Sequence, residues 1–354
     1  MKGLILSGGK GTRLRPITHT SAKQLVPVAN KPVLFYGIEA IAQAGITDIG
    51  IIIAPETGDE IRDAVGDGSR FSVSVTYIEQ DRPAGLAHAV LTAEPFLAED
   101  PFVMYLGDNL LQGGITELVD RFRRSVPDAL ILLTPVDDPE NYGVAELDGD
   151  RVVALVEKPV EPRGNLALVG VYMFTAAIHN AARAIEPSAR GELEITDAIQ
   201  WLIDAGNLVL SEVLAGWWID TGKLTPLLEA NRLLLEGVER RIDGEVDSES
   251  QLDGRVVVEA GARLVRSHVR GPAIIGARAE VVDSFIGPFS AIGPDCVIRN
   301  SEIEHSVLLG STRVLDAGRI EDSLLGYNVE VTRSARRPRA TRLMLGDHCL
   351  VDLS

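Results

Sequence analysis

The stretch that decides the fold reads Leu6-Ser7-Gly8-Gly9-Lys10-Gly11-Thr12-Arg13-Leu14-Arg15-Pro16, and it directly follows an apolar run at residues 3–6. That run has the length of a buried strand, so the glycines predict a tight turn at its carboxyl end. Open α/β sheets bind ligands at this edge, where backbone N–H groups can approach phosphate oxygens. Glycines alone fit a plain turn equally well. Two cations, Arg13 and Lys23, favour phosphate binding, because the chain is otherwise acidic.

Outward from this stretch, strand-length apolar runs alternate with segments of helical periodicity up to about residue 235. We expect strands at residues 3–6, 49–54, 73–78, 102–106 and 129–133, and helices at residues 32–44, 59–65, 85–93, 116–125 and 224–235. The first helix would take Asn30 as its N-cap, Pro32 in its first turn and Gly45 as its stop. Such alternation predicts an α/β fold with a mostly parallel sheet covered on both faces. Residues 144–147 and 152–157 flank Asp148-Gly149-Asp150, which predicts a hairpin.

A different pattern begins at about Gly244. Aliphatic residues followed by Gly occur at positions 275, 292, 309 and 325, in steps of 17, 17 and 16, and Ile286, Ile292 and Ile298 are spaced by six. A six-residue step with three steps per coil is typical of a parallel β-helix, whose aliphatic side chains point into a narrow prism. A β-sandwich with frequent glycine turns is the alternative, and the persistent register favours the β-helix. The repeat is imperfect between Glu302 and His305, where we expect a bulged coil.

Composition narrows the class of protein. The 354 residues include 34 basic and 51 acidic side chains, a net charge of −17, which argues against nucleic acid as a partner. The two cysteines, Cys296 and Cys349, lack the spacing of a disulfide framework or a zinc site. The first apolar run is too short for a signal peptide and no run reaches membrane-spanning length, so we expect a cytoplasmic protein. The length predicts two domains, which we place at residues 1–240 and 241–354.

Several motifs together support a more specific hypothesis. The pattern Gly-Gly-x-Gly-Thr-Arg-Leu-x-Pro, followed by Lys23-Gln24-Leu25-Val26-Pro27-Val28, resembles the signature of the sugar-phosphate nucleotidyltransferase family. Further stretches agree in order and spacing, at residues 106–109, 141–144, 156–159, 190–197 and 218–222. The resemblance covers nearly the whole chain and is closest to long-form members that act on dTTP and glucose 1-phosphate. It implies a Rossmann-like domain with a mixed, mostly parallel sheet, followed by a left-handed parallel β-helix that assembles the protein into a homo-oligomer.

Two aspartates are candidate metal ligands. Asp108 follows the predicted strand at residues 102–106, and Asp220 follows the short apolar run Trp217-Trp218-Ile219. Carboxylates that converge at the ligand edge of a sheet could hold Mg²⁺, which takes one or two carboxylates together with phosphate oxygens and waters. For either aspartate alone, a solvated turn or a helix cap is the commoner explanation. The resemblance favours Mg²⁺ binding by both.

The resemblance also implies roles for single residues. Arg13, Lys23 and Lys158 would be catalytic. The nucleotide would be bound by Leu6, Gly8, Gly9, Gly11, Thr12, Gln24, Gln80, Pro83, Gly85 and Asp108. The sugar phosphate would be bound by Gly107, Tyr142, Gly143, Glu157, Lys158, Gly170, Glu192 and Trp218. The chain departs from the family at Ala84 and His88, because members often carry Pro-x-Gly-Leu-Ala-Gln with a polar residue at the second position; the base preference is therefore less firmly implied than catalysis.

The implied reaction is a direct attack by a sugar phosphate oxygen on the α-phosphorus of dTTP, with pyrophosphate leaving. A phosphate is already ionised at neutral pH, so no catalytic base is needed. UTP or another nucleotide is the main rival substrate. A non-catalytic regulatory subunit is disfavoured, because the candidate cations and carboxylates are all present. Acetyl transfer by the β-helix would need a histidine base, and the surroundings of the candidates His268, His305 and His348 are not distinctive.

Overall fold

The computed structural model describes residues 1–9, 14–15, 17, 22–222, 224–333 and 348–352. The chain forms two compact units: Met1–Lys10 with Val33–Asp220, and Gly11–Pro32 with Thr221–Ser354. The segment 11–32 therefore groups with the C-terminal part of the chain, although it lies between two segments of the first unit in sequence. The domain boundary that we placed at residue 240 stays a prediction.

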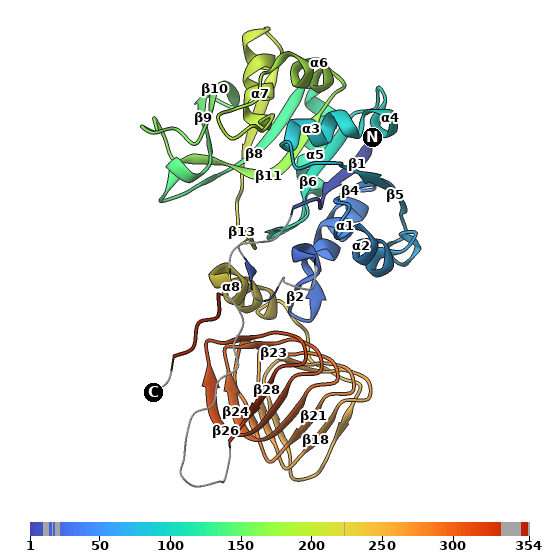
Figure 1. The fold of residues 1–354 in the computed structure, drawn as a ribbon, viewed down its shortest axis with the longest axis vertical. Coiled ribbons are helices and arrows are strands. Elements are labelled where there is room, and N and C mark those ends of the chain that lie inside the picture. The colour runs from blue at the N-terminus through green and yellow to red at the C-terminus, as the bar shows by residue number, and fades with distance from the viewer. Residues whose placement is uncertain (10–13, 16, 18–21, 223, 334–347, 353–354) are drawn as a thin grey trace. The chain divides into compact units, whose positions relative to one another are not determined.

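The first unit is built on a nine-stranded mixed sheet in the order β5-β4-β1-β6-β11-β8-β12-β10-β9 (Figure 1). Neighbouring strands pair in parallel in the runs β5-β4-β1-β6 and β8-β12, whereas β11 is antiparallel to β6 and β8, and β10 and β9 form an antiparallel hairpin. The strands are β1 Lys2–Leu6, β4 Asp48–Ile53, β5 Ser74–Glu79, β6 Phe102–Leu106, β8 Ala129–Pro135, β9 Gly143–Asp148, β10 Arg151–Glu157, β11 Leu166–Phe174 and β12 Val209–Val213.

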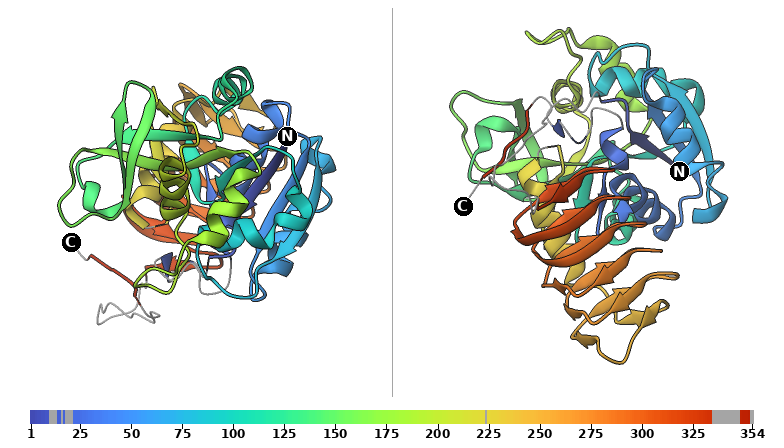
Figure 2. Two further views of the ribbon diagram at one scale, coloured as in Figure 1. Left: turned by 90° about the horizontal axis from the view of Figure 1, so that it is seen from above. Right: turned by 60° about the horizontal axis from the view of Figure 1, so that its bottom comes forward.

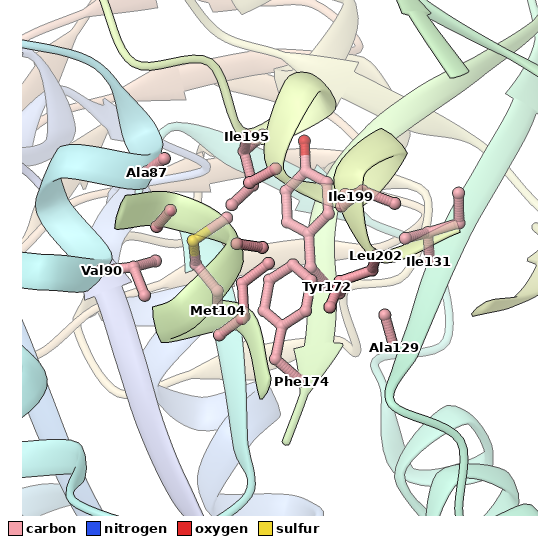
Figure 3. Packing of buried hydrophobic residues seen from close by; sticks show 14 of the residues in the cluster. Ala87, Val90, Met104, Ala129, Ile131, Tyr172, Phe174, Ile195, Ile199 and Leu202 are labelled. Carbon is pink, nitrogen blue, oxygen red and sulfur yellow. The ribbon is translucent and has the colours of Figure 1, made fainter. Parts of the chain in front are cut away.

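Helices cover both faces of this sheet, as the alternation of elements predicted. On one face a core cluster joins Phe102, Met104 and Phe174 of the strands to α3 (Leu86–Thr92), α6 (Ala177–Ala184) and α7 (Ile195–Asp204). Figure 3 shows Met104 and Phe174 of this cluster with Val90 of α3 and Ile199 of α7. On the other face α1 (Val33–Gln43) approaches the strands closely, since a Cβ on Gly37 would lie 3.1 Å from the Tyr105 ring. A strand contributes side chains to both faces, because its successive side chains point to opposite sides of the sheet. The remaining helices are α2 Gly58–Val65, α4 Glu94–Leu97 and α5 Thr116–Ser125.

The predicted elements are found at or within two residues of their expected bounds. The β9–β10 hairpin is present, with Gly149 at φ +63° in its turn. Gly45 ends α1 at φ +76°, as expected. The proposed N-cap of α1 was wrong, because Asn30 lies at φ +59° in the turn of a hairpin formed by β2 (Pro27–Val28) and β3 (Lys31–Pro32). Pro32 belongs to β3 and precedes the helix, which begins at Val33.

The second unit contains the β2–β3 hairpin, helix α8 (Leu224–Leu235) and a parallel β-helix (Figure 2, right). Its short strands pair in parallel with the strand one coil later, for example Val257 with Ile274 and Ile274 with Ala291. The strands are β14 Arg241–Ile242, β15 Glu245–Val246, β16 Gln251–Asp253, β17 Val256–Val258, β18 Arg263–Val265, β19 His268–Arg270, β20 Ala273–Ile275, β21 Glu280–Val282, β22 Phe285–Ile286, β23 Ser290–Ile292, β24 Val297–Glu304, β25 Val307–Leu308, β26 Arg313–Glu321, β27 Leu324–Leu325 and β28 Glu330–Thr332.

The six-residue spacing reflects the prism. Ile286, Ile292 and Ile298 are fully buried in one core cluster, each on a different strand. The repeat is irregular here as expected, but the expected bulge between Glu302 and His305 was wrong. Ile286 pairs with Ile303 at a step of 17 and Ile292 pairs with Leu308 at a step of 16, so one residue is missing between Ile303 and Leu308. A register shift lies instead between Arg299 and Ser301, where β24 pairs with β26. The short step thus falls one coil earlier than the Ile/Leu-Gly spacing suggested, because Leu308, not Leu309, is in register with Ile292.

A ladder of serines lines one corner of the β-helix. The Oγ atoms of Ser250, Ser267, Ser284 and Ser301 each accept a hydrogen bond from the backbone N–H one coil later, at 3.0–3.2 Å. Ser284 also donates its hydroxyl proton to the carbonyl of Val282 at 2.7 Å. Each serine therefore satisfies backbone groups that the corner leaves out of the strand pairing. No helix in the described part of the chain has both the length and the apolar character needed to span a bilayer.

Candidate functional site

The turn after β1 and the residue after β5 meet at the carboxyl edge of the sheet. The backbone N–H of Ser7 donates to the carbonyl of Ile52 at 2.9 Å, which extends the parallel pairing by one residue. A Cβ on Gly8 would lie 3.3 Å from Gln80 Oε1, so the absence of a side chain lets the main chain approach this amide. Gln80 is 8% exposed, and its Nε2 lies 2.9 Å from His88 Nδ1. His88 therefore orients the Gln80 amide from α3.

Gly85 is required by a close backbone contact. Its φ is +104°, and a Cβ there would lie 2.3 Å from the carbonyl oxygen of Leu193. The backbone of this loop pairs with Leu193 on both sides, since Leu193 N–H donates to Ala84 at 2.8 Å and Ala87 N–H donates to Leu193 at 3.1 Å. The exposed Pro83 precedes this pairing. The loop that the resemblance assigns to the base is thus fixed to the segment that leads into α7.

The two candidate metal ligands are brought together by a short antiparallel pair of strands. Gly107 N–H donates to the carbonyl of Leu6 at 2.9 Å, so Asp108 follows at the same edge as the glycine-rich turn. Beyond it, β7 (Asn109–Leu111) pairs with β13 (Trp218–Asp220), and Asp220 lies directly opposite Asn109. Asp220 therefore faces Asn109, which is the residue directly after Asp108.

Asn109 contacts both strands of this pair, and no role was predicted for it. Its Nδ2 donates to Asp108 Oδ1 at 3.0 Å, and its Oδ1 accepts from Trp218 Nε1 at 2.5 Å. The Trp218 ring packs edge-on against Tyr142, with the centroids 5.6 Å apart. Burial raises the pKa of Tyr142, and the charges of Asp138 and Asp220 raise it further, so its phenol stays protonated. For Asn109, the signal available in the sequence was its position directly after the metal-ligand candidate Asp108.

This donor set fits a magnesium ion better than a transition metal. Asp108 and Asp220 offer carboxylate oxygens, which are the ligands that a hard cation prefers. In the described part of the chain there is no group of three or more His, Cys, Asp or Glu side chains that could hold a metal alone. Mg²⁺ needs only one or two carboxylates when the substrate's phosphates supply the rest. Asp108 and Asp220 therefore fit the ion that the resemblance implies.

A second group of candidate residues lies at the open end of the β9–β10 hairpin. Gly143 pairs with Glu157, and the N–H of Lys158 donates to the carbonyl of Tyr142 at 2.9 Å. Lys158 has φ +43°, an uncommon conformation for a residue with a side chain, and such strain is often found where a side chain must be aimed. A Cβ on Gly143 would lie 2.6 Å from Thr196 Cγ2, so this position admits no side chain.

Glu157 is held in place from several directions. Its Oε1 accepts from Arg190 Nη2 at 2.9 Å and lies 3.6 Å from Lys158 Nζ, while its Oε2 accepts from Thr196 Oγ1 at 3.2 Å. Arg190 also contacts the buried Glu194 at 2.9 Å and so bridges two carboxylates. Sequence reasoning quoted Arg190 and Thr196 only as parts of a motif, because the contacts span more than thirty residues.

The cluster of acidic side chains around Glu157 includes Asp197 of α7. Burial raises the pKa of Asp197, and the negative charges of Glu194 and Glu157 raise it further. Glu192 lies in the turn before α7, half-buried, and its carbonyl accepts from the Ser188 N–H at 2.9 Å. This surface thus combines acceptors for hydroxyl groups with the cations Lys158 and Arg190.

Gly170 links the two groups of residues. It lies where the register of β11 shifts, and a Cβ there would lie 2.7 Å from Leu106 Cδ1 and 2.8 Å from Asn109 Oδ1. Leu6 and Leu106 pair in the sheet beneath. The first unit therefore brings together Leu6, Gly8, Gln80, Gly107, Asp108, Gly170, Trp218 and Asp220, with Tyr142, Gly143, Glu157 and Lys158 connected to them through the Tyr142–Trp218 contact.

Two further candidates, Lys23 and Gln24, belong to the second unit. Lys23 and Gln24 lie in a 3₁₀ turn at Lys23–Leu25 of the second unit. Gln24 is 1% exposed, and its Oε1 has no hydrogen-bond partner among the residues that the structure describes. A buried, unpaired amide oxygen is costly in a folded protein and fits a group that a ligand completes. Gly11, Thr12 and Arg13 lie outside the described residues, and Gly9 is half-buried in the turn after Gly8.

Two of the three histidines that were candidates for acetyl transfer are paired with carboxylates, and the third, His348, is exposed. His268 Nε2 lies 2.7 Å from Asp253 Oδ2, and His305 Nδ1 contacts Asp322. His268 lines a groove of ≈ 560 Å³ on the β-helix together with Arg266 and Asp283, which form an ion pair at 2.7 Å. Glu249, Glu302 and Arg333 also line this groove.

Comparison with known proteins identifies the family of the chain. A family model described as nucleotidyl transferase matches residues 2–237, and a model described as a GlmU-like, C-terminal hexapeptide matches residues 284–349. A glucose-1-phosphate thymidylyltransferase of Streptomyces antibioticus is 59% identical over 100% of this chain and 99% of its own length, and one of Streptomyces griseus is 56% identical over 100% of both. A crystal structure of a putative glucose-1-phosphate thymidylyltransferase from Bacillus anthracis is 39% identical, with a TM-score of 0.62 over 66% of this chain and 94% of that one.

Proposed function

Because the chain belongs to the nucleotidyl transferase family, we propose that it transfers a thymidylyl group from dTTP to glucose 1-phosphate, giving dTDP-glucose and pyrophosphate. Two relatives that match over their whole length carry the name of this activity. The observation in the structure that supports it best is the β7–β13 pairing, which sets Asp220 opposite Asn109 and so beside Asp108. That pairing is what a site for a metal-bound triphosphate requires.

In the proposed reaction an oxygen of the sugar phosphate attacks the α-phosphorus of dTTP. A bond forms between that oxygen and phosphorus, and the bond to the bridging oxygen of pyrophosphate breaks, so the electron pair leaves with pyrophosphate. No proton has to be removed from the nucleophile, because the sugar phosphate is already ionised. Catalysis then consists of holding two anions together and compensating the charge that develops on the leaving group.

The chain's own residues divide this work. Lys158, aimed by its strained backbone, binds the sugar phosphate, and Glu157, fixed by Arg190 and Thr196, accepts hydrogen bonds from sugar hydroxyls. Lys23 and Arg13 compensate the charge of the triphosphate. Mg²⁺ bound to Asp108 and Asp220 would supply charge compensation and orientation of the phosphates.

Recognition of the base falls to two glutamine amides. Gln80, whose Nε2 is held by His88 and the Gly85 carbonyl, and Gln24, with its unpaired buried oxygen, each offer an acceptor oxygen to the edge of a pyrimidine. A pocket that reads only the 5-methyl group distinguishes dTTP from UTP by about 1–3 kcal/mol. The preference between these two nucleotides is therefore the most sensitive part of the proposal.

The experiment that tests the proposal is pyrophosphate release with Mg²⁺, measured for dTTP, UTP, GTP, ATP and CTP against the 1-phosphates of glucose, mannose and N-acetylglucosamine. We expect a clear maximum for dTTP with glucose 1-phosphate. A maximum for UTP would change the nucleotide and keep the reaction, whereas no release from any pair would overturn the assignment. The proposal also includes self-association into a homo-oligomer, and a monomer in light scattering would remove that part alone.

A further inference from the structure

The β2–β3 hairpin has an uncommon turn. Its two turn residues, Ala29 and Asn30, both have positive φ, at +48° and +59°. A two-residue turn of this kind suits the twist of a hairpin but favours Gly and Asn, and alanine in it is strained by about 1–2 kcal/mol. Such conformations persist only where the surroundings determine them. The neighbours of this turn must therefore hold it in place.

Asn231 of α8 is one of these neighbours. It is 1% exposed, and its Oδ1 accepts from the N–H of Ala29 at 3.0 Å. Its Nδ2 donates to the carbonyl of Phe289, at a corner of the β-helix, at 2.8 Å. One buried amide thus joins the hairpin to the β-helix, and removing it would leave two partly buried backbone groups without these hydrogen bonds.

Two further contacts act on the same turn. Asn30 Nδ2 donates to the carbonyl of Ile292, three residues beyond Phe289, at 2.7 Å. The methyl group of Ala29 packs against a cluster formed by Leu235, Val257 and Ile274, which belong to α8 and to the first coils of the β-helix. The hairpin is therefore fixed by hydrogen bonds and by apolar packing, all within the second unit.

Next to this hairpin lie two residues to which we assign the nucleotide, Lys23 for the triphosphate and Gln24 for the base. Lys23 and Gln24 directly precede β2, in the turn at Lys23–Leu25. We propose that Asn231 is a positioning residue for nucleotide binding, which acts by fixing the β2–β3 hairpin, and with it Lys23 and Gln24, onto the β-helix. The β-helix then serves as a rigid support for Lys23 and Gln24. This inference rests on the proposed roles of Lys23 and Gln24.

The test is steady-state kinetics of Asn231→Leu, which keeps a similar volume and removes both hydrogen bonds. We expect KM for dTTP to rise about ten-fold, which corresponds to ~1.4 kcal/mol, with a decrease in kcat. KM for glucose 1-phosphate should change less than about two-fold, because Glu157 and Lys158 belong to the first unit. Asn30→Gly, which tolerates the positive φ and loses only the contact with Ile292, should change KM for dTTP in the same direction and by less.

Ser284→Ala is the matched control, because it removes a buried hydrogen bond from the same β-helix without touching the hairpin. It should lower the melting temperature and leave both KM values unchanged. Hydrogen exchange should show faster exchange of the Leu25 and Val26 amides in Asn231→Leu only. If the wild type is active and Asn231→Leu, still folded, keeps its KM for dTTP, the inference is overturned while the proposed function stands. If the wild type releases no pyrophosphate, the proposed function falls and takes the positioning role with it.

Discussion

At the scale of single residues, Glu157 has the most closely defined surroundings in the candidate sugar site. Arg190, Thr196 and Lys158 all lie within 3.6 Å of its carboxylate oxygens. Glu157→Gln keeps the shape and removes the charge, so hydrogen bonds from sugar hydroxyls weaken. We expect KM for glucose 1-phosphate to rise about ten-fold and the preference for glucose over mannose 1-phosphate to narrow. Glu161→Gln, on the exposed loop nearby, should leave both unchanged in the same pyrophosphate assay.

The close packing around Gly170 predicts that an added side chain would destabilise the fold. An alanine there would place its Cβ within 2.8 Å of Leu106 Cδ1 and Asn109 Oδ1, so Asn109 would have to leave its partners Asp108 and Trp218. We expect Gly170→Ala to lower the free energy of unfolding by about 1–3 kcal/mol and to reduce turnover. Urea denaturation followed by tryptophan fluorescence measures the first effect. Gly164→Ala is the control, because its nearest contact would be Ala145 O at 4.0 Å; an equal loss in that variant would contradict the steric explanation.

His179 makes a prediction about pH. Burial lowers its pKa below the ordinary 6.5, although the carboxylate of Glu94 acts in the opposite direction. As pH falls through 6.5 the unfolded chain binds a proton that the folded chain refuses, so stability is lost on acidification. In His179→Leu the melting temperature should therefore fall less between about pH 7.5 and pH 5.5 than in the wild type. The exposed His348 provides the control, since His348→Leu should keep the wild-type slope.

At the scale of elements, the serine ladder predicts where the β-helix is sensitive. Ser284→Ala leaves the N–H of Ser301 without its acceptor in a buried corner, which costs about 1–3 kcal/mol. Ser323 occupies the end of a second, shorter ladder, and within the described residues no backbone N–H is recorded as donating to its Oγ. We expect Ser284→Ala to lower the melting temperature measured by circular dichroism and Ser323→Ala to change it little. Equal effects would contradict the ladder as a source of stability.

The elements themselves were largely predictable, and their long-range contacts were not. Hydrophobic periodicity predicted seven of the nine strands of the sheet, the helices α1, α2, α3, α5 and α8, and the β-helix, because each follows from local spacing. Strands β11 and β12 and helices α4, α6 and α7 were not predicted. The turn at Ala29 and Asn30 was missed, since alanine disfavours positive φ and the reason for it lies in Asn231, some 200 residues away. The contacts of Asn109 with Trp218 and of Arg190 with Glu157 were missed for a similar reason, because each partner is distant in the sequence. The roles of the candidate site residues stay predictions until the kinetics are measured.

At the scale of the whole molecule, the two units have separate cores. The cluster beneath α3, α6 and α7 and the cluster inside the β-helix share no residue. All three tryptophans, Trp201, Trp217 and Trp218, belong to the first unit, so their fluorescence reports on that unit alone, whereas circular dichroism reports on both. We expect Gly170→Ala to shift the fluorescence transition and Ser284→Ala to shift only the transition seen by circular dichroism. Coincident shifts in both variants would mean that the units unfold as one.

The grouping of residues 11–32 with the C-terminal unit also determines how this protein can be recombined with its relatives. A chimera that exchanges residues 221–354 alone replaces Asn231 and the β-helix corners while keeping the native hairpin, and so mismatches a contact that each parent has tuned for itself. Crossovers at residues 10/11, 32/33 and 220/221 instead transfer the hairpin together with its support. Exchanging the second unit between homologues therefore requires two separate inserts rather than one.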